Sequence, residues 1–140
     1  MSQIRTYLDA SVIMNAWKGQ DDNRIIAMQI LDDDHRHLLT SRYLQLELLP
    51  KPTFYKNHLE LDFINRILSR AEQIADEPRI TKFAVDLAGK YDLAPLDALH
   101  IASALVGRAM EFLSFEKPGK PLYRLPSDLM RVVALSTLAG

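Results

Sequence analysis

The chain has 140 residues, 48% of them hydrophobic and 25% charged, and its 17 Lys and Arg nearly balance its 18 Asp and Glu. This length and composition predict a single globular domain, residues 1–140, and exclude wholesale disorder and fibrous proteins. The chain contains no cysteine and its five glycines are isolated from one another, which excludes disulfide frameworks, thiolate chemistry, phosphate-binding loops and dinucleotide cofactors.

The first half of the chain predicts two short strands among helices. Residues 4–8 alternate as a strand does, and Asp9 and Ser11 are good N-cap residues for a short helix over 12–17. A second helix is expected to end before the three aspartates at 32–34, because acidic charge is unfavourable at a helix C-terminus. Then follow an expected strand at 37–40, a helix capped by Ser41 and stopped by Pro50 and Pro52, and a mostly helical segment over 54–74.

The second half predicts two helices and two further strands. One helix begins at Pro78 and ends at Gly89, and a more apolar helix over 98–106 ends at Gly107. Strands are expected at 112–115 and 132–135. Short apolar strands separated by helices indicate crossover connections. We therefore expect an α/β fold of three layers, α/β/α, with a central parallel sheet that binds ligands outside the carboxyl ends of its strands.

The sequence also predicts a location. No apolar run approaches the roughly 18 residues that a membrane-spanning helix needs. The N-terminal residues lack the apolar segment of a signal peptide. We therefore expect a cytoplasmic protein with no membrane partner.

Four carboxylates interrupt otherwise apolar segments. Asp9 ends the first strand and Glu47 lies inside a mostly apolar helix. Asp97 stands at the start of a core helix, and Glu116 directly follows a late strand. Singly, they can be explained as helix N-caps (Asp9 and Asp97) or as members of ordinary ion pairs. Four carboxylates at one locus, however, repel one another unless a cation compensates them, and Mg²⁺ and Mn²⁺ take oxygen ligands of this kind.

Four sequence blocks in this order resemble the PIN domain family. The blocks are Leu8-Asp9-Ala10-Ser11, Thr40-Ser41 followed by Glu47, the run from Leu96 to Ala104, and Phe112 to Glu116. The Asp-Ala-Leu-His-Ile-Ala run that begins at Asp97 is the most specific of them. The chain length and single-domain layout also resemble the VapC-type toxins, a bacterial and archaeal branch of that family.

The resemblance implies a metal-dependent ribonuclease that hydrolyses RNA phosphodiester bonds, the toxin of a type II toxin–antitoxin pair. Asp9 and Asp97 would be the principal ligands of Mg²⁺ or Mn²⁺, Glu47 a further ligand or a water-positioning base, and Glu116 weaker outer support. Ser11 and Ser114 would line the same site. The expected partners are RNA, a cognate antitoxin protein and a second copy of the chain in a homodimer.

The fourth block departs from the family pattern. The family usually has Thr-x-Asp where this chain has Ser114-Phe115-Glu116. The Glu116 side chain is longer by one methylene, so its carboxylate can reach the site but alters the second metal position. The alternative to a ribonuclease is therefore a catalytically weak PIN-like module that binds nucleic acid or a protein without cutting it.

Basic and aromatic residues flank these acids in the sequence. For Arg42, Lys51, Lys117 and Lys120 the alternatives are a solvated surface and contacts to RNA phosphates. Without the four acids, 17 basic side chains face 14 acidic ones, which fits an acidic pocket in a mildly basic frame.

Two further groups of ring side chains are assigned to packing. His100 is expected to be a packed histidine bonded to backbone rather than a metal ligand. The aromatic side chains nearest the acids are expected to pack in the core or a dimer interface, with base stacking as the alternative: Trp17, Tyr43, Phe54 and Tyr55.

Overall fold

The computed structural model describes residues 2–138, and its centre is a five-stranded, entirely parallel sheet. The strands are β1 (Ile4–Leu8), β2 (Arg36–Thr40), β3 (Glu72–Gln73), β4 (Glu111–Ser114) and β5 (Arg131–Ala134). Their spatial order is β3-β2-β1-β4-β5. The chain therefore winds from β1 toward β3 and then returns to the other side of β1, so that the winding reverses between β1 and β4.

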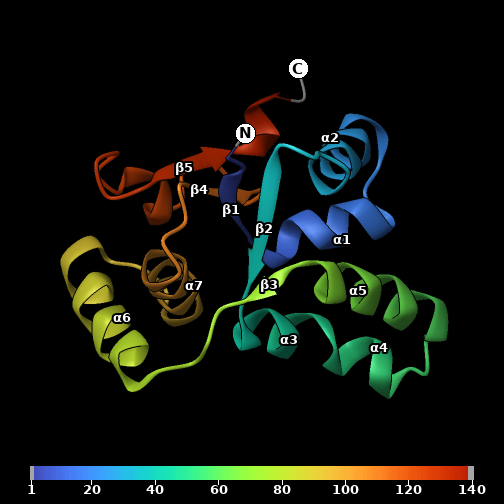
Figure 1. The fold of residues 1–140 in the computed structure, drawn as a ribbon, viewed down its shortest axis with the longest axis horizontal. Coiled ribbons are helices and arrows are strands. Elements are labelled where there is room, and N and C mark those ends of the chain that lie inside the picture. Colours follow the sequence, from blue (N-terminus) through green and yellow to red (C-terminus); the bar gives the residue numbers. More distant parts are fainter. Residues whose placement is uncertain (1, 139–140) are drawn as a thin grey trace.

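Helices cover both faces of the sheet, which confirms the expected three-layer α/β/α fold (Figure 1). The first group comprises α1 (Ala10–Lys18), α2 (Asp21–Leu31), α3 (Arg42–Leu48), α4 (Pro50–Phe54) and α5 (His58–Arg70). The second comprises α6 (Pro78–Tyr91) and α7 (Pro95–Val106), which lie together at the left of Figure 1. Parallel crossovers are right-handed, so reversing the winding direction moves the connecting helices to the opposite face of the sheet. Two short 3₁₀ helices follow, η1 (Pro121–Arg124) and η2 (Leu135–Leu138).

The central strands are buried on both faces, as expected of a parallel sheet between helical layers. Tyr7 and Leu8 of β1 and Phe112 and Leu113 of β4 are all almost inaccessible to solvent. The Tyr7 and Phe112 rings stack with their centroids 5.3 Å apart, which joins the two strands between which the winding reverses. Buried aromatic side chains therefore join the two halves of the sheet at this point.

Several element boundaries differ from the sequence-based expectation. Pro50 does follow the end of α3, but Pro50 and Pro52 then lie in α4, because proline fits the first turn of a helix. The expected helix over 54–74 is shorter: α5 starts at His58, where Asn57 accepts a hydrogen bond from the Glu60 amide, and β3 follows it. The α6 helix runs through Gly89 to Tyr91 and ends at Asp92, which has a left-handed backbone conformation.

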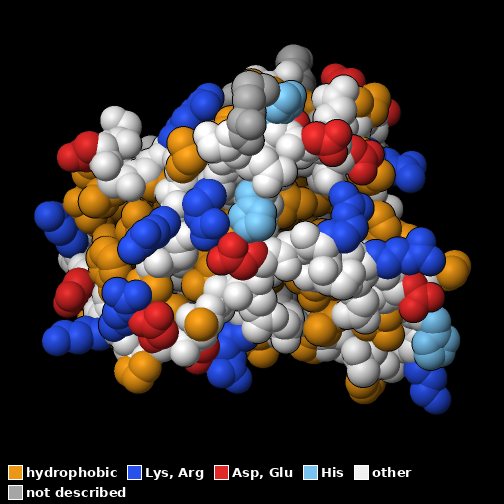
Figure 2. Space-filling model, in the orientation of Figure 1, with side chains coloured by type: hydrophobic (Ala, Val, Ile, Leu, Met, Phe, Trp, Pro, Cys, Tyr) orange, Lys and Arg blue, Asp and Glu red, His pale blue; other side chains and the backbone are white. Residues whose placement is uncertain are grey.

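The surface carries both signs of charge. Figure 2 shows basic and acidic side chains interspersed on one face, with apolar side chains visible between them. This mixture agrees with a net charge of −1. Among residues 2–138, no helix has the length and apolar character needed to span a bilayer.

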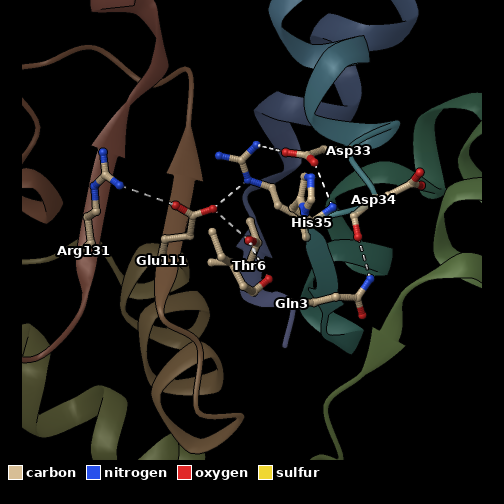
Figure 3. Close-up of polar contacts among 9 residues, drawn as sticks. Gln3, Thr6, Asp33, Asp34, His35, Glu111 and Arg131 are labelled. Atoms are coloured by element: carbon tan, nitrogen blue, oxygen red, sulfur yellow. Dashed lines mark hydrogen bonds and ion pairs between the residues drawn. The ribbon is translucent and has the colours of Figure 1, made fainter. Parts of the chain in front are cut away.

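A buried acid holds the amino ends of the strands together. The carboxylate of Glu111, 4% exposed, accepts hydrogen bonds from Thr6 Oγ1 at 2.8 Å and Arg36 Nε at 2.7 Å. Arg131 lies 4.0 Å away on the other side (Figure 3). Arg36 also pairs with Asp33 at 2.7 Å. This cluster links β1, β2, β4 and β5 at the end of the sheet opposite Asp9.

Replacing Arg36 with methionine should leave the Glu111 carboxylate buried without its main partner. We expect the free energy of unfolding in urea to fall by about 2–4 kcal/mol. The double variant Arg36→Met/Glu111→Gln should recover part of the loss, because no uncompensated charge remains. The matched control is Arg79→Met, whose ion pair with Glu77 is exposed and should leave stability nearly unchanged. Equal losses in Arg36→Met and Arg79→Met would contradict this role of Glu111.

Candidate functional site

The four acids singled out from the sequence come from four different elements at the carboxyl ends of the strands. Asp9 directly follows β1, and Glu116 lies two residues beyond β4, so both stand where the winding of the sheet reverses. Asp97 comes from the first turn of α7 and Glu47 from α3. Such a reversal point is where open parallel sheets bind ligands, because the adjacent loops leave in opposite directions.

The carboxylate of Asp9 is buried and held by two hydroxyl groups. Ser11 Oγ and Ser114 Oγ each donate to Asp9 Oδ2 at 2.8 Å. Ser11 Oγ accepts from the Phe115 amide at 2.9 Å, and Ser114 Oγ accepts from the Glu116 amide at 3.0 Å. Both serine bonds go to one carboxylate oxygen, so they orient Asp9 without using Oδ1. Asp9 occupies the N-cap position of α1, but its side chain makes no capping bond.

Glu47 is held by a chain of buried side chains. Its carboxylate bonds His100 Nε2, His100 Nδ1 lies 2.7 Å from Tyr7 Oη, and Tyr7 Oη lies 2.6 Å from Ser41 Oγ. With Glu47 ionised and the imidazole neutral, Nε2 carries the proton that it donates to Glu47, and Nδ1 accepts from Tyr7. Tyr7 in turn accepts from Ser41. Burial raises the pKa of Tyr7, so the phenol keeps the proton that it donates.

The expectation that His100 bonds to backbone is wrong, although the ring is buried as expected. Both nitrogens are used by side chains, one of which belongs to the site itself. Asp9, Glu47 and His100 each offer one potential ligand atom within 4.8 Å of the others. Because Nε2 is bonded to Glu47 and Nδ1 to Tyr7, His100 orients Glu47, and the carboxylate oxygens of Asp9 and Glu47 are the better metal donors.

Asp97 and Glu116 share a different neighbour. Lys120 Nζ lies 3.8 Å from Asp97 Oδ2 and 3.5 Å from Glu116 Oε2. The pKa of Asp97 is raised, mainly because the carboxyl is half-buried. The charge of Lys120 opposes this shift, while the charges of Asp9 and Glu116 add to it. Asp9 and Glu116 therefore act electrostatically on Asp97, and Asp9 in turn lies close to Glu47.

The donor set fits a hard divalent cation. It consists of carboxylate oxygens with serine hydroxyls beside them, which suits Mg²⁺ or Mn²⁺ rather than a metal that prefers sulfur. The partners of Asp9 and Glu47 are hydroxyl and imidazole groups, which orient the carboxylates without adding a fixed positive charge. A bound cation would supply that compensation.

The flanking basic residues occupy different surroundings. Arg42 is exposed, and its ion-pair partner, at 3.1 Å, is Asp76 rather than one of the four acids. Lys51 lines a groove of about 320 Å³ whose wall includes Glu47. Lys117 is exposed, whereas Lys120 reaches the acids themselves. Of these four candidates for phosphate contact, Lys51 shares a groove with one of the acids and Lys120 pairs with two of them.

The aromatic residues that flank the acids in the sequence include both packed and exposed side chains. Trp17 packs against Phe63 with ring centroids 5.3 Å apart, as expected for a packing role, and it lines the same groove as Tyr55. Phe54 is 77% exposed and Tyr55 73% exposed. A core position is therefore wrong for Phe54 and Tyr55.

The comparisons with known proteins agree with this geometry. The chain matches the family model for the PIN domain over residues 6–117. The comparison with curated proteins finds no match. The solved structure of VapBC2 from Rickettsia felis bound to a promoter DNA fragment superposes with a TM-score of 0.71 and 15% identity, covering 93% of this chain and 98% of that one.

Two further solved structures are similar. A toxin–antitoxin complex from Klebsiella pneumoniae has a TM-score of 0.71 and 21% identity, covering 91% of this chain and 95% of that one. FitAcB from Neisseria gonorrhoeae has a TM-score of 0.56 and 19% identity, with the same coverage. At these identities the three structures establish a shared fold. The family model spans Asp9, Glu47, Asp97 and Glu116 together, and the chain belongs to the PIN domain family.

Proposed function

We propose that this PIN domain is a divalent-metal-dependent endoribonuclease and acts as the toxin of a type II toxin–antitoxin pair in the cytoplasm. The observation that carries the nuclease proposal is a group of carboxylates where the sheet reverses its winding: Asp9 lies close to Glu47, and Asp97 and Glu116 share Lys120. The toxin proposal is supported by similar structures that include toxin–antitoxin complexes and match more than nine-tenths of both chains.

Phosphodiester hydrolysis adds the hydroxyl of water to phosphorus and breaks one phosphorus–oxygen ester bond, whose oxygen leaves with a proton. A divalent cation supplies the positive charge that shields the phosphate from the carboxylates, together with the acidity that activates water. Asp9 and Asp97 would be the principal residues that hold the cation. Glu47, oriented by His100, either completes that binding or accepts the proton of the attacking water.

The hydrogen-bond partners of Asp9 suit the role of a metal ligand. Its two serine partners fix the carboxylate before metal or RNA arrives, so no reorganisation is needed in the reaction. Lys51 shares a groove with Glu47 and Lys120 pairs with Asp97 and Glu116, so both can contact phosphates of the bound strand, as can the exposed Lys117 and Arg42. RNA as the substrate, a cognate antitoxin and a homodimer belong to the same proposal, on the likeness to the VapC branch.

Asp9→Asn should abolish cleavage of an RNA panel in Mg²⁺ or Mn²⁺. We expect the rate to fall by more than about 100-fold, because the variant loses a metal-binding charge. The matched control is Asp86→Asn, an exposed acid on α6, which should cleave at the wild-type rate. Cleavage products are measured on gels with the wild-type enzyme with and without EDTA. Undiminished cleavage by Asp9→Asn would refute the assignment.

Expression of the wild-type chain alone should arrest bacterial growth, whereas Asp97→Asn should allow growth at the same protein level. Co-expression of the protein encoded beside it should restore growth, because an antitoxin blocks the site. Growth curves and immunoblots provide the measurement. If the purified wild type binds no Mn²⁺ in calorimetric titration, the chain is instead a PIN-like binding module.

Tyr7→Phe should test the chain of side chains behind Glu47. The loss of Oη leaves His100 Nδ1 and Ser41 Oγ without this partner in the core, so we expect about 1–3 kcal/mol of lost stability. Mn²⁺ affinity should fall severalfold because Glu47 is less well oriented. The control is Tyr43→Phe, whose hydroxyl bonds Asp76 at the surface and should cost less than about 0.5 kcal/mol. Equal effects of the two variants would contradict the role of Tyr7.

A further inference from the structure

Lys120 brings a positive charge into the site from the same chain. Its ammonium lies within ion-pair distance of Asp97 and Glu116, at 3.8 and 3.5 Å. By contrast, the ligand atoms that cluster most closely among the described residues belong to Asp9 and Glu47, together with His100. Among the described residues, Asp97 and Glu116 therefore share a lysine partner, whereas Asp9 and Glu47 pair with no lysine or arginine.

The fold holds the Lys120 backbone in place. Its amide donates to the Lys117 carbonyl at 3.0 Å, which closes the turn after Glu116. Its carbonyl accepts from the Tyr123 amide at 3.2 Å, where η1 begins. Tyr123 Oη donates to the Glu116 carbonyl at 2.8 Å, and burial raises the pKa of this phenol, so it remains a donor. Lys120 therefore extends from a segment tied on both sides to the loop that carries Glu116.

The charge balance of the site favours one metal ion beside this lysine. One divalent cation and one ammonium leave the four ionised carboxylates with a single uncompensated negative charge. A second divalent cation held by Asp97 and Glu116 would lie beside the Lys120 ammonium, and the two positive charges would repel each other.

We propose that Lys120 is the second cation of the site, standing at Asp97 and Glu116 in place of a second divalent ion. The proposal rests on the proposed nuclease function and specifies its metal requirement as one ion. An ammonium carries three N–H donors and can neutralise charge that develops on a phosphate oxygen. It also gives a role to the longer Glu116 side chain, which reaches Lys120 as well as the site.

The test is the number of Mn²⁺ ions bound, measured by calorimetry and by electron paramagnetic resonance. The wild type should bind one Mn²⁺ with the spectrum of an isolated ion. Lys120→Gln should bind two, with the spectrum of a spin-coupled pair, because Asp97 and Glu116 have lost their cation. The matched control is Lys117→Gln, which removes the same charge from the same loop outside the ion pairs and should bind one Mn²⁺. Lys120→Arg keeps a cation at this place and should also bind one.

Cleavage of RNA gives a second measurement. The wild-type rate should rise with the first power of Mn²⁺ concentration below saturation. For Lys120→Gln we expect a rate on the order of 100-fold lower at low Mn²⁺. The rate should recover at high Mn²⁺ with a steeper dependence, since a second ion then takes the place of the ammonium.

Two results would overturn the role of Lys120 alone. A wild type that binds two spin-coupled Mn²⁺ ions leaves no place for it as a cation, and an unchanged Mn²⁺ count in Lys120→Gln reduces it to a surface ion pair. Either result leaves the nuclease function intact if RNA is still cleaved. Conversely, the expected Mn²⁺ counts without any RNA cleavage would support the role of Lys120 and refute the nuclease. No Mn²⁺ binding in the wild type would overturn both.

Discussion

The reversal of winding between β1 and β4 is the constraint on which the site depends. It brings the loops after these two strands next to each other, and no local helix or turn could do so. Asp9 consolidates the junction twice: its amide donates to the Leu113 carbonyl at 3.0 Å, and its carboxylate accepts from Ser114. The residue that we propose as a principal metal ligand is therefore also one that joins the two halves of the sheet.

Buried carboxylates at the two ends of the sheet have different kinds of hydrogen-bond partner. At the amino end, the negative charge of Glu111 is neutralised by Arg36 of the same chain. Thr6 donates a further hydrogen bond to this carboxylate, and Arg131 lies beside it. At the carboxyl end, Asp9 has serine hydroxyls as partners. Serine orients a carboxylate and leaves its charge available, whereas arginine cancels it. The nature of the partner thus separates an acid that stabilises the fold from one suited to hold a cation.

Much of this arrangement was predictable from sequence, because each of the four acids breaks an apolar pattern beside a strand or within a helix. Glu111 was missed because it breaks no apolar pattern. It lies at the first position of β4, where a charged residue looks like part of the preceding loop. The strand β3 has only Glu72 and Gln73, so no apolar alternation marks it. Its position is set by pairing with β2.

The contacts of loops and long side chains were beyond prediction. The sequence left Lys117 and Lys120 equivalent, and only the turn that follows Glu116 decides which of them reaches the acids. Likewise, the sequence indicated a packed histidine at His100, but its side-chain partners Tyr7 and Glu47 come from distant segments. Side chains that join remote parts of the chain leave no periodic mark in the sequence.

The brevity of β3 has a consequence for how other chains can approach the sheet. This outer strand offers two residues of backbone, and Glu72 there is engaged by Arg5 and His37. A short, charged border of this kind discourages a foreign strand from extending the sheet, which guards against aggregation. On this border, a partner protein gains little from main-chain pairing and must instead be recognised by side chains on the helices and loops.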